Sequence, residues 1–134
     1  MLRLVLTALI YIVGLFDLMM GVNFFIDPQV AAAGAGFSVA PINPTGLATI
    51  RADMTAFFVV SGLAMMWGAW RRNADLLVVP AGLFGMAMVI RILTALTVGP
   101  GPDYLLPIAV EAIHFVLLLA AWKFLPHHKL AEMG

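Results

Sequence analysis

Four long apolar stretches, separated by short polar or turn-forming segments, dominate the pattern of residues along the chain. They cover about residues 4–26, 46–70, 76–98 and 104–125. A helix needs roughly 20 mostly apolar residues to cross a bilayer, and each stretch reaches that length. The segments between them are rich in proline, glycine and asparagine, which favour turns. The pattern therefore predicts an all-α fold, in which residues 1–134 form one membrane domain, a bundle of four transmembrane helices.

Basic residues near the helix ends predict the direction of the bundle. Those that flank the ends on one side are Arg3, Arg71, Arg72, Lys123 and Lys129. The two loops on the other side contain no lysine or arginine, so the positive-inside rule predicts that both termini are cytoplasmic. A cleaved secretory signal is the alternative for the first stretch. That stretch is long for a signal, and Asp17 interrupts it.

The first outer loop begins with a helix-start signal. Asp27 is a good N-cap residue, and Pro28 suits the first helical position. We therefore expect residues 27–33 to be partly helical and to close over the layer of ionisable residues in the outer half of the bundle. An ordinary connector is the alternative.

Composition narrows the class of function. The chain is 63% hydrophobic and only 10% charged, which is typical of a protein whose surface faces lipid. Seven basic and seven acidic side chains balance, so the net charge gives no reason to expect a nucleic-acid partner. The absence of cysteine excludes disulfides and thiolate metal sites.

Every predicted span nevertheless contains an ionisable residue in its outer half or near its centre. These candidate ligand-binding residues are Asp17, Arg51, Asp53, Arg91, Glu111 and His114. Each such group costs roughly 2.5–3.5 kcal/mol to insert, so it is expected to face the bundle interior and find a partner. Two interpretations stay open. The charges hold the helices together, or they form a polar pocket that binds a ligand.

Depth along the helices predicts the pairs. Arg91 and Glu111 lie at similar distances from the outer ends of two spans joined by a short loop, so we expect them to be in contact. Asp17 is a plausible partner for Arg51, because Asp53 points to a different face of its own helix. On the first span, Gly14, Asp17, Gly21 and Phe24 share the face that we expect to be buried.

The remaining chemistry centres on the motif formed by Glu111 and His114. Di-metal helical bundles use two such E-x-x-H motifs, and this chain has one, with two arginines in the same layer, so no metal site is predicted. His114 could act as a general acid or base beside Glu111. The alternative is that His114 has no catalytic role and only forms a hydrogen bond to the Glu111 carboxylate. No nucleophile or phosphate-binding motif is present.

Several segments together resemble a known family. They are "IDP" after the first span, "IRADMTAFFVVSGLAMMWGAW", "RILTALTVGPGPD" and Glu111 in the last span. They are similar to the small bacterial membrane proteins grouped as DUF4345, which in turn resemble the DoxX-like four-helix membrane proteins. The resemblance implies a four-helix protein of the bacterial inner membrane, without an established activity. Some DoxX-like proteins are associated with quinone-linked oxidoreductases, so it also implies a quinone or lipid partner, by analogy alone.

The leading hypothesis is a membrane protein that binds a lipid-like or amphipathic small molecule, such as a quinone or a lipid, in its outer half. Arg51 and Arg91 would meet the polar end of the ligand, and Glu111 with His114 would tune them. One alternative is an accessory or assembly subunit of a larger membrane complex or homo-oligomer. The other is a membrane oxidoreductase or isomerase that uses His114 and Glu111. Beyond the quinone of the analogy, no cofactor is predicted.

Overall fold

The computed structural model describes residues 1–36, 43–101 and 104–127, and these residues form helices and turns without a strand. The elements are α1 (Leu2–Ile26), α2 (Pro28–Gly34), α3 (Pro44–Arg71), the 3-10 helix η1 (Ala74–Leu77), α4 (Val78–Thr97) and α5 (Leu105–Phe124). Four helical segments are long and apolar enough to cross a membrane, with η1 and α4 together forming the third. The predicted all-α fold with four helices long and apolar enough to cross a membrane is confirmed. Lys129, which entered the prediction of direction, lies outside the described residues.

The short helix expected in the outer loop is present as α2. The Asp27 side chain accepts hydrogen bonds from the backbone N–H groups of Gln29 and Val30, both at 3.1 Å, and Pro28 follows it at the first helical position. In the same way Asn43 accepts a hydrogen bond from the Gly46 N–H at 2.8 Å and caps α3. Local capping chemistry therefore fixes where both helices begin.

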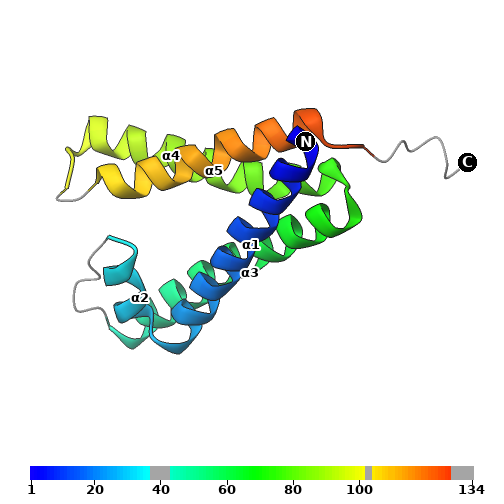
Figure 1. Ribbon diagram of the computed structural model, residues 1–134. Helices are drawn as coiled ribbons and strands as arrows, with labels where there is room; N and C mark the ends of the chain where they lie inside the picture. Colours follow the sequence, from blue (N-terminus) through cyan, green and yellow to red (C-terminus); the bar gives the residue numbers. More distant parts are fainter. Residues whose placement is uncertain (37–42, 102–103, 128–134) are drawn as a thin grey trace, which may run out of the picture.

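The long helices form two closely packed pairs, α1 with α3 and α4 with α5 (Figure 1). Between α1 and α3 the backbones approach at glycines. A Cβ atom on Gly62 would lie 2.6 Å from the Gly14 carbonyl oxygen, so neither position has room for a larger residue. In the other pair, a Cβ on Gly85 would lie 2.8 Å from the Phe115 ring. Small residues of this kind let membrane helices approach closely.

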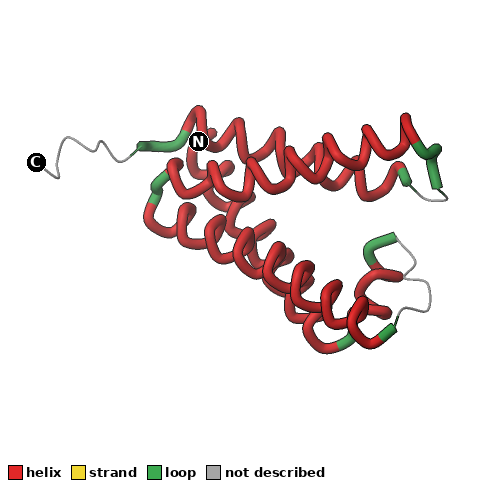
Figure 2. The backbone as a smooth tube through the Cα atoms, turned by 180° about the vertical axis from the view of Figure 1, so that it is seen from behind, coloured by secondary structure: helices red, strands yellow, loops and turns green. Residues whose placement is uncertain are grey.

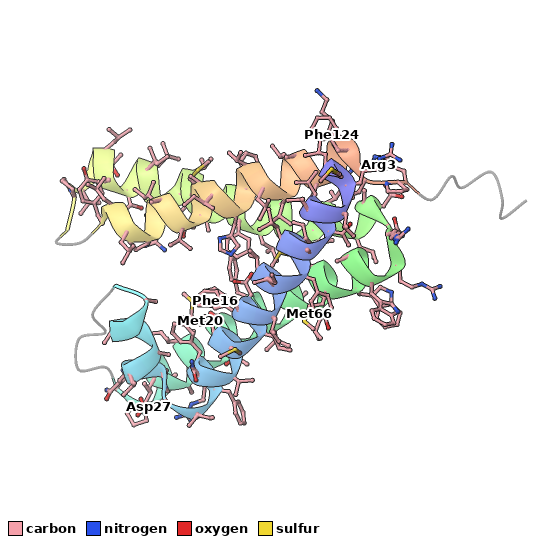
Figure 3. All side chains as sticks on the ribbon, in the orientation of Figure 1. Arg3, Phe16, Met20, Asp27, Met66 and Phe124 are labelled. Atoms are coloured by element: carbon pink, nitrogen blue, oxygen red, sulfur yellow. The ribbon has the colours of Figure 1, made fainter. Side chains whose placement is uncertain are left out.

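The two pairs meet at one end and diverge toward the other, so that the molecule has the outline of a wedge (Figures 1 and 2). At the converging end a core of buried side chains joins the pairs, including Ile10, Met65, Leu77 and Leu118. The helix termini near Arg3 and Phe124 lie at this end, and Asp27 lies at the far end (Figure 3). At that far end α2 packs on a smaller cluster that contains Phe24 and Ala32.

Large apolar side chains stay exposed along all four long helices, for example Leu4, Leu63, Leu93 and Val116 (Figure 3). In a water-soluble protein so much exposed apolar surface would be unfavourable, whereas lipid tails accept it. The interior is correspondingly small, and it contains the polar residues Asp17, Ser61, Glu111 and His114. The predicted buried face of α1 is confirmed, because Gly14, Asp17, Gly21 and Phe24 are all buried.

Candidate functional site

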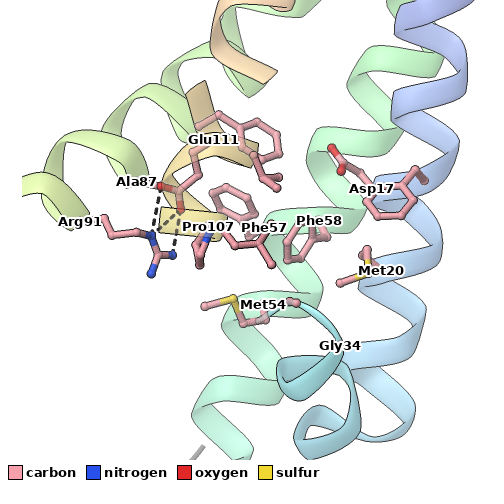
Figure 4. Close-up of a pocket in the computed structure, with 15 residues that line it drawn as sticks. Asp17, Met20, Gly34, Met54, Phe57, Phe58, Ala87, Arg91, Pro107 and Glu111 are labelled. Atoms are coloured by element: carbon pink, nitrogen blue, oxygen red, sulfur yellow. Dashed lines mark hydrogen bonds and ion pairs between the residues drawn. The ribbon is translucent and has the colours of Figure 1, made fainter. Parts of the chain in front are cut away.

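A cavity of about 340 Å³ lies between the diverging helix pairs (Figure 4). Most of its lining is apolar, with aromatic rings from three of the helices. The lining residues from α1, α2 and α3 are Phe16, Asp17, Met20, Gly34, Met54, Phe57 and Phe58, with Ala35 just after α2. Those from α4 and α5 are Phe84, Ala87, Arg91, Leu106, Pro107, Val110 and Glu111. The cavity is thus an apolar chamber with three ionisable residues in its wall.

Arg91 and Glu111 form the polar group on the α4 and α5 side of the cavity. The Arg91 Nε atom lies 3.0 and 3.1 Å from the two Glu111 carboxylate oxygens, and Nη2 lies 2.9 Å from Oε1. Such forked contacts hold the guanidinium in one orientation. The predicted contact is confirmed. It forms because a short connection makes α4 and α5 antiparallel neighbours.

Exposure differs between the two partners. The Glu111 side chain is only 9% exposed, whereas the Arg91 side chain is 37% exposed. Glu111 is the only hydrogen-bond acceptor for Arg91 among the described residues, so the guanidinium keeps donors, including those on Nη1, for another molecule. Arg91 also borders a more open groove where α4 ends and α5 begins, beside Gly99 and Tyr104. The Arg91 side chain therefore lines both the cavity and the more open groove, and part of it faces the surroundings of the protein.

Asp17 and His114 form a second polar pair, deeper in the bundle. The His114 Nε2 atom lies 3.2 Å from Asp17 Oδ1, and Nδ1 lies 2.8 Å from the Val110 carbonyl oxygen. The imidazole also stacks on the Phe84 ring, with 4.2 Å between ring centroids. Asp17 is fully buried, and its second oxygen, Oδ2, has no hydrogen-bond partner among the described residues.

This second pair corrects two predictions. Asp17 pairs with His114 and not with Arg51, and His114 is satisfied by Asp17 and Val110 and not by Glu111. The reason lies in the tertiary structure. The crossing of α1 and α5 brings together two residues that are 97 positions apart in the chain. Glu111, one turn away from His114, is already engaged by Arg91.

Arg51 and Asp53 do not belong to the polar layer. Both side chains are exposed on α3, neither lines the cavity, and neither makes an ion pair within the part of the chain that the structure describes. The expectation that they face the bundle interior is wrong. The helix pairs diverge at that depth, and α3 presents Met54 and Phe58 to the buried cluster around Phe24, so Arg51 and Asp53 stay on the exposed side of the helix.

Several cavity residues were not predicted. Met54, Phe57 and Pro107 lack any mark in the sequence that separates them from ordinary lipid-facing or core residues. Phe84 carries one usable signal, since it lies seven residues before Arg91 and therefore on the same face of the helix. Among the described residues, the structure contains no group of three or more histidine or acidic side chains placed to hold a metal ion.

Comparison with family models, with curated proteins and with solved structures gives no match to this chain. The resemblance to the DUF4345 and DoxX-like proteins therefore stays a prediction. Any function must be inferred from the cavity and its polar residues.

Proposed function

We propose that this protein binds a small amphipathic or lipid-like molecule in the cavity between its two helix pairs. The observation that carries the proposal is the cavity itself: about 340 Å³, mostly apolar, with charged residues at defined places in its wall. Ligand pockets in proteins combine apolar walls with a few polar groups in the same way, and this volume is at the small end of their range. Charges used only to hold helices together need no cavity beside them.

Arg91 is the proposed contact for the polar end of the ligand. Its guanidinium borders the cavity, is partly exposed and has donors to spare, so it can bind a carbonyl, phosphate or carboxylate oxygen. Glu111 holds the guanidinium in place and keeps the site close to neutral. An oxygen-bearing head group at Arg91 would leave the rest of the ligand beside the apolar walls.

The walls favour a ring or a short hydrocarbon chain. Phe57 meets Phe58 and Phe84 edge-on, with ring centroids 5.2 and 5.0 Å apart. Met20 and Met54 add flexible side chains that adapt to the shape of an occupant. A quinone or a lipid chain fits this chemistry, in line with the family resemblance proposed from the sequence.

The proposal includes a direction in the membrane. We place the protein in the bacterial inner membrane with both termini in the cytoplasm, so that the cavity opens in the outer half of the bilayer. In support, Arg3 and Arg72 border one pocket at the converging end of the wedge, away from α2. Basic residues gathered at one end are the usual mark of the cytoplasmic side.

The alternative of an oxidoreductase or isomerase that uses His114 and Glu111 finds less support. The two side chains bond to different partners, and His114 is not part of the cavity lining. No contact in the described residues favours the accessory-subunit alternative over ligand binding.

Native mass spectrometry of gently extracted protein tests the proposal. We expect the native chain to retain a small molecule, and Ala87→Phe, which places a ring inside the cavity, to lose it. Ala56→Phe is the matched control, because Ala56 is exposed on α3 and does not line the cavity. Equal retention by both variants, or no retained molecule in the native protein, would contradict the proposal.

A further inference from the structure

We propose that Asp17 is the hydrogen-bond acceptor through which the cavity selects molecules that carry an O–H or N–H group. This inference rests on the proposed function and adds the chemical class of the ligand. It depends on a proton count at the pair formed with His114 and on the second, unpartnered oxygen of Asp17.

The proton count follows from the two bonds of the imidazole. The Val110 carbonyl oxygen can only accept a hydrogen bond, so Nδ1 of His114 must carry a proton and donate it over the 2.8 Å contact. The 3.2 Å contact between Nε2 and Asp17 Oδ1 then needs one more proton, on either atom. Without that proton, two lone pairs would face each other.

Both placements of this proton give the same result at Oδ2. If the proton is on Oδ1, then Oδ2 is the carbonyl oxygen of a neutral acid. If the proton is on Nε2, then Oδ2 is one oxygen of a carboxylate. In both cases Oδ2 is an acceptor. A further proton on Oδ2 would leave an imidazolium without its counter-ion in the interior, which is unfavourable because Glu111 is already paired with Arg91.

The acceptor has no partner among the described residues, and Asp17 is one of the residues that line the cavity. Asp17 is 0% exposed and lines the cavity, and its carboxylate extends away from the α1 ribbon (Figure 4). A buried acceptor without a donor is unfavourable, and a ligand that brings a donor removes that cost.

A second buried polar atom without a partner lies at the same level. The close approaches of Gly62 to Gly14 and to Leu18 place the adjacent Ser61 opposite this part of α1. The Ser61 hydroxyl is fully buried and also lacks a partner among the described residues. This level of the interior therefore has polar groups without protein partners, as a site for a polar guest requires.

The two polar groups in the cavity wall are complementary. Asp17 on α1 offers an acceptor, and Arg91 on α4 offers donors across the aromatic side chains between them (Figure 4). The matching ligand has a hydroxyl or N–H group at one end and an oxygen acceptor at or beyond the other. Plain hydrocarbon chains and fully etherified molecules lack the first group and should bind more weakly.

The test compares two molecules of similar shape, 2-naphthol and 2-methoxynaphthalene, of which only the first has a hydroxyl donor. Their binding to detergent-solubilised native protein is measured by equilibrium dialysis against empty micelles of the same detergent. The empty micelles correct for the different partitioning of the two compounds. We expect 2-naphthol to bind at least about tenfold more tightly than the ether, as one buried hydrogen bond implies.

Variants assign the preference to Asp17. Asp17→Leu should bring the ratio of the two affinities to about one, because the acceptor is gone. Asp17→Asn should keep the preference, since its amide N–H can donate to His114 Nε2 while its carbonyl oxygen accepts from the ligand. Thr7→Ala removes an exposed hydroxyl that does not line the cavity and should leave the ratio unchanged.

Equal affinity of the native protein for the two compounds would overturn the inference and leave the proposed function standing. A preference that survives in Asp17→Leu would also overturn it. If neither compound binds the native protein, both the inference and the cavity as a binding site are contradicted. The comparison in the native protein needs no variant, so it holds even if Asp17→Leu does not fold.

Discussion

At the scale of single residues, the interior of this protein is organised by two polar pairs with different exposure. Arg91 keeps contact with the surroundings, whereas Asp17 has none. The two pairs share the α5 helix, where Glu111 and His114 lie one turn apart and point to different partners. A substitution in one pair should therefore leave the other pair formed.

The pair of Arg91 and Glu111 gives the first prediction. Arg91→Leu and Glu111→Leu should each destabilise the fold, because each strands a charge. The cost should be below the roughly 3–5 kcal/mol of a fully buried pair, since Arg91 is partly exposed and side chains in membranes reach for water. The double variant should recover much of the loss, measured by unfolding in mixed micelles with increasing sodium dodecyl sulfate.

A control for this prediction is the exposed pair of Asp75 and His127, whose atoms Oδ1 and Nδ1 lie 2.7 Å apart. His127→Ala should change stability by no more than about 1 kcal/mol, as is usual for exposed pairs. Purely additive losses in the double variant of Arg91 and Glu111 would show that the two residues are not coupled.

At the scale of helices, caps and close contacts explain most of the arrangement. Asp27 begins α2, Asn43 begins α3, and glycines set the distance between α1 and α3. The cap at α2 matters for the site, because Gly34 and Ala35 at the end of this short helix line the cavity. A substitution at a helix cap or at one of the contact glycines should therefore affect the stability or packing of a whole helix.

Removing the α2 cap gives the second prediction. Asp27→Ala should cost about 1 kcal/mol of local stability, because two backbone N–H groups lose their acceptor. Amide hydrogen exchange over residues 30–35 should become faster, while exchange in α5 stays unchanged. Thr7→Ala, which removes only an exposed hydroxyl bonded to the Arg3 carbonyl, is the control. Unchanged exchange in α2 would mean that tertiary packing alone holds it.

The glycine contact between α1 and α3 gives the third prediction. Gly62→Ala should destabilise the pair, since its new Cβ would lie 2.6 Å from one backbone atom and 2.8 Å from another. Gly82→Ala, on α4, meets nothing within 4 Å and should be neutral or stabilising by up to about 1 kcal/mol through helix propensity. Thermal unfolding of both variants in one detergent makes the comparison. Equal effects would show that the α1–α3 contact is not tight.

At the scale of the whole molecule, the sequence predicted the elements better than the way they are arranged. Hydropathy marks four spans because lipid imposes a length and a composition on each helix. The Arg91–Glu111 contact was predictable because a short connection nearly forces antiparallel neighbours. Asp17 with His114 was not, because their contact depends on how distant helices cross. Nor does the sequence reveal that the pairs diverge, which is why Arg51 and Asp53 were misplaced.

Direction in the membrane gives the fourth prediction, and it concerns the molecule as a whole. Both termini should be cytoplasmic, because the basic residues flank the helix ends on that side. A reporter that is active only in the periplasm should stay inactive at the C-terminus, and a second reporter that is active only in the cytoplasm should work there. The opposite result would invert the bundle and place the cavity toward the cytoplasm.

The wedge has a mechanical consequence. Each pair is stiff, since α1 meets α3 backbone to backbone and α4 is tied to α5 by Arg91 and Glu111. The pairs are joined mainly through the core around Met65 and Leu77 at the converging end. A body made of two stiff arms and one joint bends most easily at the joint, as hinged proteins do. An occupant of the cavity would then act as a spacer between the arms, and its size would set the angle at which they rest.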